Sequence, residues 1–242
     1  MPKQLEGKTI VITGASHGLG KTLVQKVAEL GAAVVLIARD EQKLSDVKVS
    51  IEKIGGQAFV YTCDLRKPED VRAMAAKLIK EHPIDILIND AGIWTEDELE
   101  KSRPELRQAA LETNVLGHIE LTEALLPYFK SRNAGHIFNV ISSSGVSDSP
   151  SGDNSSWRTY GATKWAMRGY TNALLTALKE TPIKITGFYP GGFDSDIFET
   201  AGNADAHGQS WMMKVEDVAD AAIFALTRPA DVMIETIVVT KK

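Results

Sequence analysis

The sequence has very little cysteine, with one residue, Cys63, among 242. A single cysteine cannot form a disulfide within the chain, and it cannot build a cysteine-based metal site alone. It lies in the apolar run 58–63, so we expect a buried structural thiol. No paired histidine or carboxylate spacing typical of a metal site is present either, and we therefore expect no metal.

Long hydrophobic runs and an excess of basic charge are also missing. No segment approaches the roughly 18 uninterrupted apolar residues that a membrane span needs. The N-terminus is polar and lacks the apolar run of a signal peptide. The formal net charge is −5, with 27 Lys and Arg against 32 Asp and Glu, which argues against nucleic acid as the main partner. We expect a cytoplasmic protein that binds neither membrane nor nucleic acid.

Short apolar runs alternate with longer amphipathic stretches along the whole chain. Several runs are apolar throughout, as expected for parallel strands that are covered on both faces. The expected strands are residues 9–13, 33–38, 58–62, 84–88, 136–141, 183–188 and 236–240. This order predicts an α/β fold, a Rossmann-like, doubly wound parallel sheet of about seven strands with helices on both faces. No linker or repeat divides the chain, so residues 1–242 are expected to form a single domain.

Apolar residues at helical spacing predict the helices between these strands. The first helix begins near Gly18, and the second runs from Glu41 to about Ile54, where two glycines stop it. Longer helices are expected over 106–130 and 158–179, and long polar loops over 147–156 and 196–213. Leu111, Asn114, Val115 and His118 are expected to share one face of the 106–130 helix. Loops at the carboxyl edge of such a sheet are where ligands bind.

A glycine-rich turn, TGASHGLG, follows the first expected strand. Gly14, Gly18 and Gly20 allow a tight turn and a close approach of the backbone to a phosphate. The next helix then directs its N–H groups and its positive dipole end at that charge. No Gly-Lys-Ser/Thr follows, so the turn is not a Walker A loop. A purely structural corner is the alternative, but the position between a strand and a helix favours a cofactor site.

Tyr160 and Lys164 lie one turn apart on the expected helix 158–179 and share a face. An ammonium near a phenol favours the phenolate, so we expect Lys164 to lower the pKa of Tyr160 from its reference of about 10. Such a tyrosine can exchange a proton with an alcohol or carbonyl oxygen near neutral pH. An ordinary surface contact is the alternative for this pair.

Together, the glycine turn and the Tyr-x-x-x-Lys pattern resemble the short-chain dehydrogenase/reductase family, and the likeness covers nearly the entire chain. Other motifs of that family have counterparts here in the same order. They are Asn89-Asp90-Ala91-Gly92, Asn114 within ETNVLG, the strand end at Ser142, and the turn Pro190-Gly191. Asp90 departs from the asparagine of the family and places a carboxylate in its turn.

The resemblance implies hydride transfer between a cofactor and a small carbonyl compound or alcohol. Tyr160 is then the general acid or base, and Lys164 lowers its pKa and binds the nicotinamide ribose. A serine at the end of the fifth strand holds the substrate oxygen; the motif places it at Ser142, with Ser143 second. Asn114 is implied to support a proton relay to Lys164 through water. The alternative to a catalytic role is that the serines simply end the strand and that Asn114 is a structural residue that bends its helix.

The identity of the cofactor is argued from charge after the second strand. NAD-using relatives carry an acidic residue at the position of Ala38, whereas here Arg39 follows an alanine. A guanidinium suits a 2′-phosphate. His17 stands where NADP-using relatives often have arginine, but it is only partly charged at neutral pH. Two alternatives to a cofactor role remain for Arg39: a pair with Asp40, or a solvated surface charge. We favour NADP(H) over NAD(H).

The family motifs imply a set of cofactor contacts at the ends of the strands. They are Gly14, Ser16, His17, Gly18, Leu19, Gly20, Arg39, Asp64, Leu65, Asn89, Ala91, Gly92, Tyr160, Lys164, Pro190, Gly191 and Ser195. For Asp64, a role as a helix cap or turn residue is the alternative. The resemblance also implies a homodimer or homotetramer.

Apolar residues in the loop after the sixth strand suit an apolar ketone or aldehyde. They are Phe193, Phe198, Trp211, Met212 and Met213, and anchoring of the loop in the core is the alternative for each.

Two other functions stay open, a 3-oxoacyl-thioester (acyl carrier) reductase and a non-catalytic NADP-sensing module. The second has no need for a proton-transfer tyrosine.

Overall fold

The computed structural model describes residues 3–95, 103–146, 158–201 and 207–242. Over these ranges the chain forms a parallel sheet in the order β3-β2-β1-β4-β5-β6-β7. The strands are β1 (Thr9–Thr13), β2 (Ala33–Ala38), β3 (Gln57–Thr62), β4 (Ile86–Asn89), β5 (His136–Val140), β6 (Lys184–Pro190) and β7 (Thr236–Val239). The predicted doubly wound, Rossmann-like sheet is confirmed.

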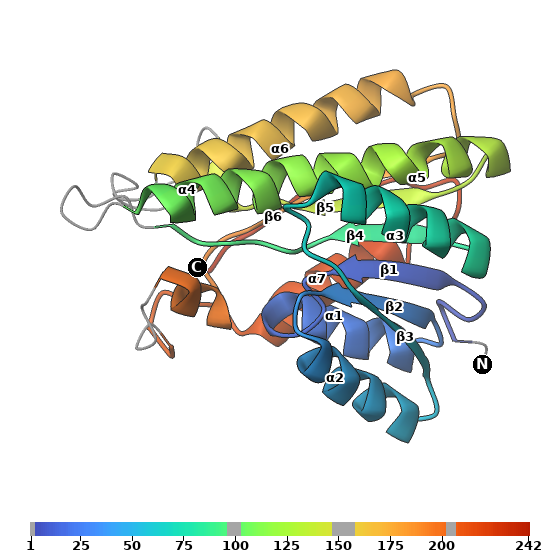
Figure 1. Ribbon diagram of the computed structural model, residues 1–242, viewed down its shortest axis with the longest axis horizontal. Helices are drawn as coiled ribbons and strands as arrows, with labels where there is room; N and C mark the ends of the chain where they lie inside the picture. Colours follow the sequence, from blue (N-terminus) through green and yellow to red (C-terminus); the bar gives the residue numbers. More distant parts are fainter. Residues whose placement is uncertain (1–2, 96–102, 147–157, 202–206) are drawn as a thin grey trace.

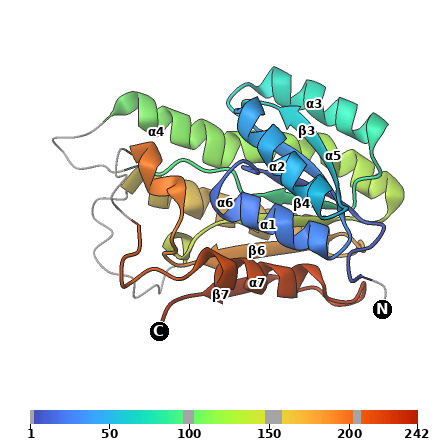
Figure 2. The same ribbon diagram turned by 90° about the horizontal axis from the view of Figure 1, so that it is seen from below.

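Helices cover both faces of the sheet (Figure 1). They are α1 (Gly18–Glu29), α2 (Glu41–Lys53), α3 (Pro68–Glu81), α4 (Pro104–Leu111), α5 (His118–Arg132), α6 (Arg158–Ala177) and α7 (Val215–Leu226). One core cluster joins the sheet to α1, α2 and α7, and the other joins it to α3, α5 and α6. Figure 2 shows α1 and α7 side by side on the same face.

Burial on both faces explains why the strand sequences are apolar throughout. All five residues of β1 are buried, with Ile10 and Ile12 in one core cluster and Val11 in the other. Successive side chains of a strand point to opposite faces, so a strand covered on both sides needs apolar residues at every position.

The strand order creates a crevice between β1 and β4. From β1 the chain adds β2 and β3 on one side, and from β4 it adds β5, β6 and β7 on the other. At such a reversal the connections leave the two neighbouring strands in opposite directions, and ligands bind at their carboxyl ends. Thr13 and Asn89 are the last residues of these two strands.

The predicted helix 106–130 is three segments, because a π-helical segment, η1 (Glu112–Gly117), separates α4 from α5. A π turn contains an extra residue and shifts the phase of the side chains that follow it. Asn114, Val115 and His118 are buried, but Leu111 is 46% exposed. The prediction that Leu111 shares their face is therefore wrong.

The remaining boundaries agree with the prediction, with strand ends that differ by two residues or fewer. The expected loop 147–156 lies outside the described residues. In the expected loop 196–213 the structure has a 3-10 helix, η4 (Asp196–Ala201). Cys63 is buried, as predicted, and burial raises the pKa of its thiol to about 11. None of the helices in the described ranges is long and apolar enough to span a membrane.

Candidate active site

A cavity of about 360 Å³ lies among the segments that follow β1, β4, β5 and β6, with α6 as a further wall. Many of the predicted site residues line it. They are Gly14, His17, Gly18, Leu19, Ala91, Gly92, Ser142, Ser143, Tyr160, Lys164, Pro190, Gly191 and Ser195. The other predicted residues lie outside its lining, namely Ser16, Gly20, Arg39, Asp64, Leu65, Asn89 and Asn114.

The glycine-rich turn forms one wall of the cavity, and its backbone favours glycine at three positions. Gly14 and Gly18 have φ values of 71° and 54°, a region that favours glycine. A Cβ on Gly14 would lie 2.9 Å from the Cα of Ala91, and a Cβ on Gly20 would collide with the carbonyl oxygen of Gly14. Because α1 begins at Gly18, its free N–H groups and dipole favour an anion here. These residues fit the phosphates of a dinucleotide.

Thr13 ties the Asn89–Gly92 turn to the first strand. Its Oγ1 accepts the backbone N–H groups of Asp90 and Ala91 at 3.0 and 3.1 Å. The side chain of Asn89 donates to Asn139 Oδ1 at 2.8 Å and to Thr122 Oγ1 at 3.0 Å. The asparagine side chain thus links two strands and α5 behind the cavity wall.

The buried side chain of Asn114 joins three segments around the site. Its Oδ1 accepts the N–H of Ile93 at 2.7 Å, and its Nδ2 donates to the carbonyl of Ile93 at 2.9 Å and to Thr163 Oγ1 at 3.2 Å. These bonds hold the segment after β4 against α6. The proposed water relay from Asn114 to Lys164 stays a prediction.

Ser142, Tyr160 and Lys164 meet on the same wall of the cavity. The Ser142 hydroxyl hydrogen-bonds the Tyr160 hydroxyl, and its oxygen also accepts the N–H of Ser144 at 3.1 Å. Lys164 Nζ lies 5.3 Å from the centroid of the Tyr160 ring and donates to the carbonyl of Val140 at 3.4 Å. The strand end and α6 therefore place a hydroxyl, a phenol and an ammonium together.

The pKa of Tyr160 is shifted in the direction opposite to the one predicted. Burial raises the pKa of Tyr160 well above its ordinary value, the bond from Ser142 lowers it in part, and the negative charge of Asp90 raises it further. Burial also lowers the pKa of Lys164 to about 8, and Asp90 partly opposes that change. Desolvation of the phenolate is the largest of these effects on the pKa of Tyr160. The prediction that Lys164 would lower this pKa is therefore wrong for the net shift.

Basic residues converge where β2 ends beside the glycine turn. Burial lowers the pKa of His17; the charges of Asp196 and Glu199 oppose that change, whereas the charges of Lys43 and Arg39 add to it. Lys43 is in the first turn of α2 and was not among the predicted residues, although its i+4 spacing from Arg39 is visible in the sequence. Asp40 caps α2 by accepting the Lys43 N–H at 3.0 Å.

Asp64 stabilises a local turn, which is the role given above as the alternative to a cofactor contact. Its carboxylate accepts the N–H of Arg66 at 3.1 Å and the Arg66 Nε at 2.9 Å. These bonds lower the pKa of Asp64. A cofactor contact by Asp64 stays a prediction.

The model of the short chain dehydrogenase family matches residues 8–206. This chain belongs to that family. An uncharacterized oxidoreductase of Staphylococcus saprophyticus is 31% identical over 239 residues, which are 98% of each chain. The predicted resemblance is confirmed, and this short-chain dehydrogenase is an enzyme that acts on alcohol or carbonyl groups.

Solved structures of the family share the fold over almost the full length. A short-chain dehydrogenase from Sphingobium yanoikuyae in complex with NADPH has a TM-score of 0.84 at 26% identity, and the match covers 96% of this chain and 87% of that one. An alcohol dehydrogenase from the archaeon Thermococcus sibiricus, complexed with 5-hydroxy-NADP, has a TM-score of 0.82 at 26% identity, with 96% of both chains covered.

Aromatic residues form the wall of this short-chain dehydrogenase that faces Tyr160. The ring centroid of Trp94 lies 4.5 Å from that of Tyr160 and 5.1 Å from that of Phe198. Phe193, Phe198 and Trp211 line the cavity as predicted, whereas Met212 and Met213 are buried outside its lining, which is the anchoring role. The prediction missed Trp94, which stands two residues after the Asn89–Gly92 motif.

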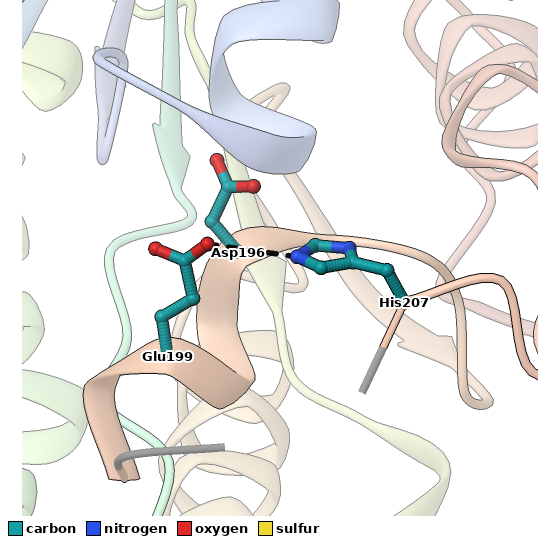
Figure 3. A group of neighbouring side chains, drawn as sticks. All are labelled: Asp196, Glu199 and His207. Atoms are coloured by element: carbon teal, nitrogen blue, oxygen red, sulfur yellow. Dashed lines mark ion pairs between the residues drawn. The ribbon is translucent and has the colours of Figure 1, made fainter. Parts of the chain in front are cut away.

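Asp196, Glu199 and His207 approach one another on the exposed side of the loop after β6 (Figure 3). Nδ1 of His207 lies 2.6 Å from Asp194 Oδ1, and its Nε2 lies 3.6 Å from Glu199 Oε1. These two contacts connect His207 to Asp194 and Glu199, which lie earlier in the same loop. The bond to Asp194 raises the pKa of His207. The absence of a metal from this enzyme stays a prediction.

Proposed function

We propose that this short-chain dehydrogenase interconverts a small apolar ketone or aldehyde and its alcohol, with NADP(H) as cofactor. The observation that carries the proposal is the convergence of Ser142, Tyr160 and Lys164 on one cavity. That cavity has a phosphate-binding turn on one side and an aromatic wall on the other.

The residues that would hold the cofactor are the Gly14–Gly20 turn and the basic group of His17, Arg39 and Lys43. A guanidinium and an ammonium together suit a 2′-phosphate, which NADP has and NAD lacks. The NADP-type cofactors in two solved relatives support this choice. When bound, NADP(H) supplies or accepts a hydride.

Tyr160 carries the proton in the proposed mechanism. In reduction, its hydroxyl gives a proton to the substrate oxygen, and in oxidation it takes that proton back. The Ser142 hydroxyl holds the same oxygen and supports the charge that develops on it. Lys164, whose pKa is about 8, is mainly an ammonium at neutral pH and adds a positive charge to this wall.

The aromatic wall favours an uncharged substrate. Trp94 is buried against Tyr160, and Phe198 and Trp211 pack next to it at 5.1 Å and 6.0 Å between successive ring centroids. Such a surface excludes water and offers few partners to a charged group.

A panel of carbonyl compounds, followed through the absorbance of NADPH, tests the proposal. We expect neutral aliphatic and aryl ketones or aldehydes to be reduced, and matched keto acids with a free carboxylate to have a kcat/KM at least about tenfold lower, because a carboxylate loses hydration against the rings. Turnover of 3-oxoacyl thioesters alone would favour the acyl-carrier reductase. Absence of turnover with every compound, alongside tight NADPH binding, would favour the sensing module.

Arg39→Ala should weaken NADPH binding by about 10- to 100-fold and change NADH binding little, since a charged hydrogen bond to phosphate contributes about 1.5–3 kcal/mol. Lys43→Ala should have the same direction and a smaller effect, because an ammonium binds phosphate as a point charge. Both are measured by fluorescence titration of each cofactor. Lys48→Ala is the matched control, because Lys48 lies on the same helix and pairs with Glu52. An unchanged NADPH/NADH preference in Arg39→Ala would contradict the assignment.

A further inference from the structure

Lys241 is a charged residue of the cavity that the proposed mechanism does not use. It lies two residues after the end of β7, and together with Thr240 it lines the cavity. Its place is fixed by the edge of the sheet, where β7 pairs with β6 and the N–H of Gly191 donates to the carbonyl of Val239 at 2.7 Å. The segment after β7 therefore lies beside the turn that follows β6.

The ammonium of Lys241 bridges two backbone carbonyls of the loop after β6. Its Nζ donates to the carbonyl of Ser210 at 2.5 Å and to the carbonyl of Met212 at 2.9 Å. These two residues flank Trp211 in the chain. A charged donor makes stronger hydrogen bonds than a neutral one, so the bridge fixes the backbone from which the Trp211 side chain projects.

Trp211 lacks the enclosure that holds a core side chain in place. It lines the cavity but is 48% exposed, and its ring meets that of Phe198 at 6.0 Å between centroids. The ring lies over Gly192, since a Cβ on this glycine would lie 2.2 Å from Cζ3 of Trp211. Because the residue is about half exposed, the position of its ring depends on the backbone that carries it.

The backbone around Trp211 is attached to the rest of the protein on two sides. On one side, Met213 is buried in a core cluster, and its N–H donates to the carbonyl of Gly192 at 3.0 Å. The N–H of Asp194 donates in turn to the carbonyl of Met213 at 3.0 Å. The other attachment is the bridge from Lys241, which comes from a segment distant in sequence.

We propose that Lys241 is a positioning residue that sets the substrate specificity of the enzyme through Trp211. By bridging the carbonyls on both sides of Trp211, its ammonium keeps the ring over Gly192, where the ring completes the aromatic wall of the cavity. An aryl group has more apolar surface to bury against this wall than a small alkyl group, so the bridge favours aryl ketones. The effect on substrates rests on the proposed function, whereas the attachment of the loop to Lys241 does not.

Hydrogen exchange of the cofactor-free enzyme, read by mass spectrometry of the peptide that covers residues 209–213, tests the attachment. Lys241→Met keeps an apolar stem and removes both hydrogen bonds, so the amides of this peptide should exchange about tenfold faster. Lys242→Met is the matched control, because Lys242 is exposed and lies outside the cavity lining. It should leave the exchange unchanged.

Lys241→Ala provides a second variant without the two hydrogen bonds, and circular dichroism establishes that each variant is folded. Faster exchange in both variants supports the proposal. Exchange equal to that of the wild-type enzyme in either folded variant overturns it.

A double-mutant cycle tests whether Lys241 acts through Trp211. The quantity measured is the ratio of kcat/KM for acetophenone to kcat/KM for 2-butanone. Trp211→Ala and Lys241→Met should each lower this ratio by about tenfold, and the double variant should also lower it by about tenfold rather than a hundredfold. Additive effects would show that Lys241 acts independently of Trp211 and would overturn the proposal.

The separate kinetic constants distinguish positioning from general damage to the enzyme. In Lys241→Met the KM for acetophenone should rise, while kcat stays within about twofold of the wild type, because Tyr160 and Ser142 are untouched. A residue that only stabilised the fold would lower the rates of both ketones by the same factor and leave their ratio unchanged. That result would contradict the role in specificity.

A keto acid separates positioning from direct binding of a charged substrate. If the ammonium of Lys241 bound a substrate carboxylate, Lys241→Met would lower kcat/KM for benzoylformate and leave acetophenone unaffected, and the proposal would be overturned. If the wild-type enzyme reduced no carbonyl compound, the proposed function would fail. The exchange measurement would still decide whether Lys241 holds the loop that carries Trp211.

Discussion

Tyr160→Phe should lower kcat/KM for carbonyl reduction by about a thousandfold or more, because general acid catalysis by a positioned group contributes about 10²–10⁴-fold. NADPH binding should remain nearly unchanged. The phenylalanine ring keeps the packing against Trp94, whose centroid lies 4.5 Å from that of Tyr160, so the loss is confined to the hydroxyl. Steady-state rates with NADPH, together with a fluorescence titration of NADPH, measure the two effects.

Tyr170→Phe is the matched control for this variant. Tyr170 lies on the same helix, and its hydroxyl donates to Glu123 at 2.7 Å, away from the cavity. It should keep wild-type rates. If both variants kept full activity, Tyr160 would be excluded as the proton donor.

Gly20→Ala should weaken NADPH binding by about 100-fold and lower the free energy of unfolding by about 1–3 kcal/mol, the usual cost of overpacking. The new Cβ would collide with the carbonyl oxygen of Gly14 and would lie 2.7 Å from Asp90 Oδ2. The glycine turn must then move, and its backbone no longer presents the N–H groups that receive a phosphate. Fluorescence titration and denaturant unfolding measure the two changes.

Gly169→Ala is the control for the glycine substitution. Gly169 lies in α6, and a Cβ there would meet nothing within 4 Å. This variant should be about 0.5–1 kcal/mol more stable, because alanine is the better helix former. If Gly20→Ala behaved like Gly169→Ala in both measurements, the tight turn would not be needed for the cofactor.

The sheet could be predicted from the sequence because each strand carries its own signal. β1 and β2 were predicted with their observed ends, since strands that are buried on both faces are apolar at nearly every position. The 106–130 helix was less predictable. Its π-helical segment surrounds Asn114, whose side chain bonds to Ile93 and Thr163 on other segments. Those contacts are absent from the local pattern.

The site was predicted in part. Family-like motifs placed Ser142, Tyr160 and Lys164 correctly on one cavity wall. Trp94, which lines the cavity, and Lys43, whose charge acts on His17, were missed, because each comes near the predicted residues only through the approach of another element. The periodicity of α2 does not show that its first turn faces His17, and the sequence after Gly92 does not show that Trp94 packs on α6.

The sequence by itself determined the α/β fold, the glycine turn after the first strand and the placement of Tyr160 and Lys164 on one helical face, since these follow from local spacing. The tertiary structure decided the charge state of that pair. Spacing alone predicts a lowered pKa for Tyr160, but burial by segments distant in sequence raises it, and the carboxylate of Asp90 adds to that rise. Desolvation and charge depend on everything packed around a group, and only the folded chain determines which residues those are.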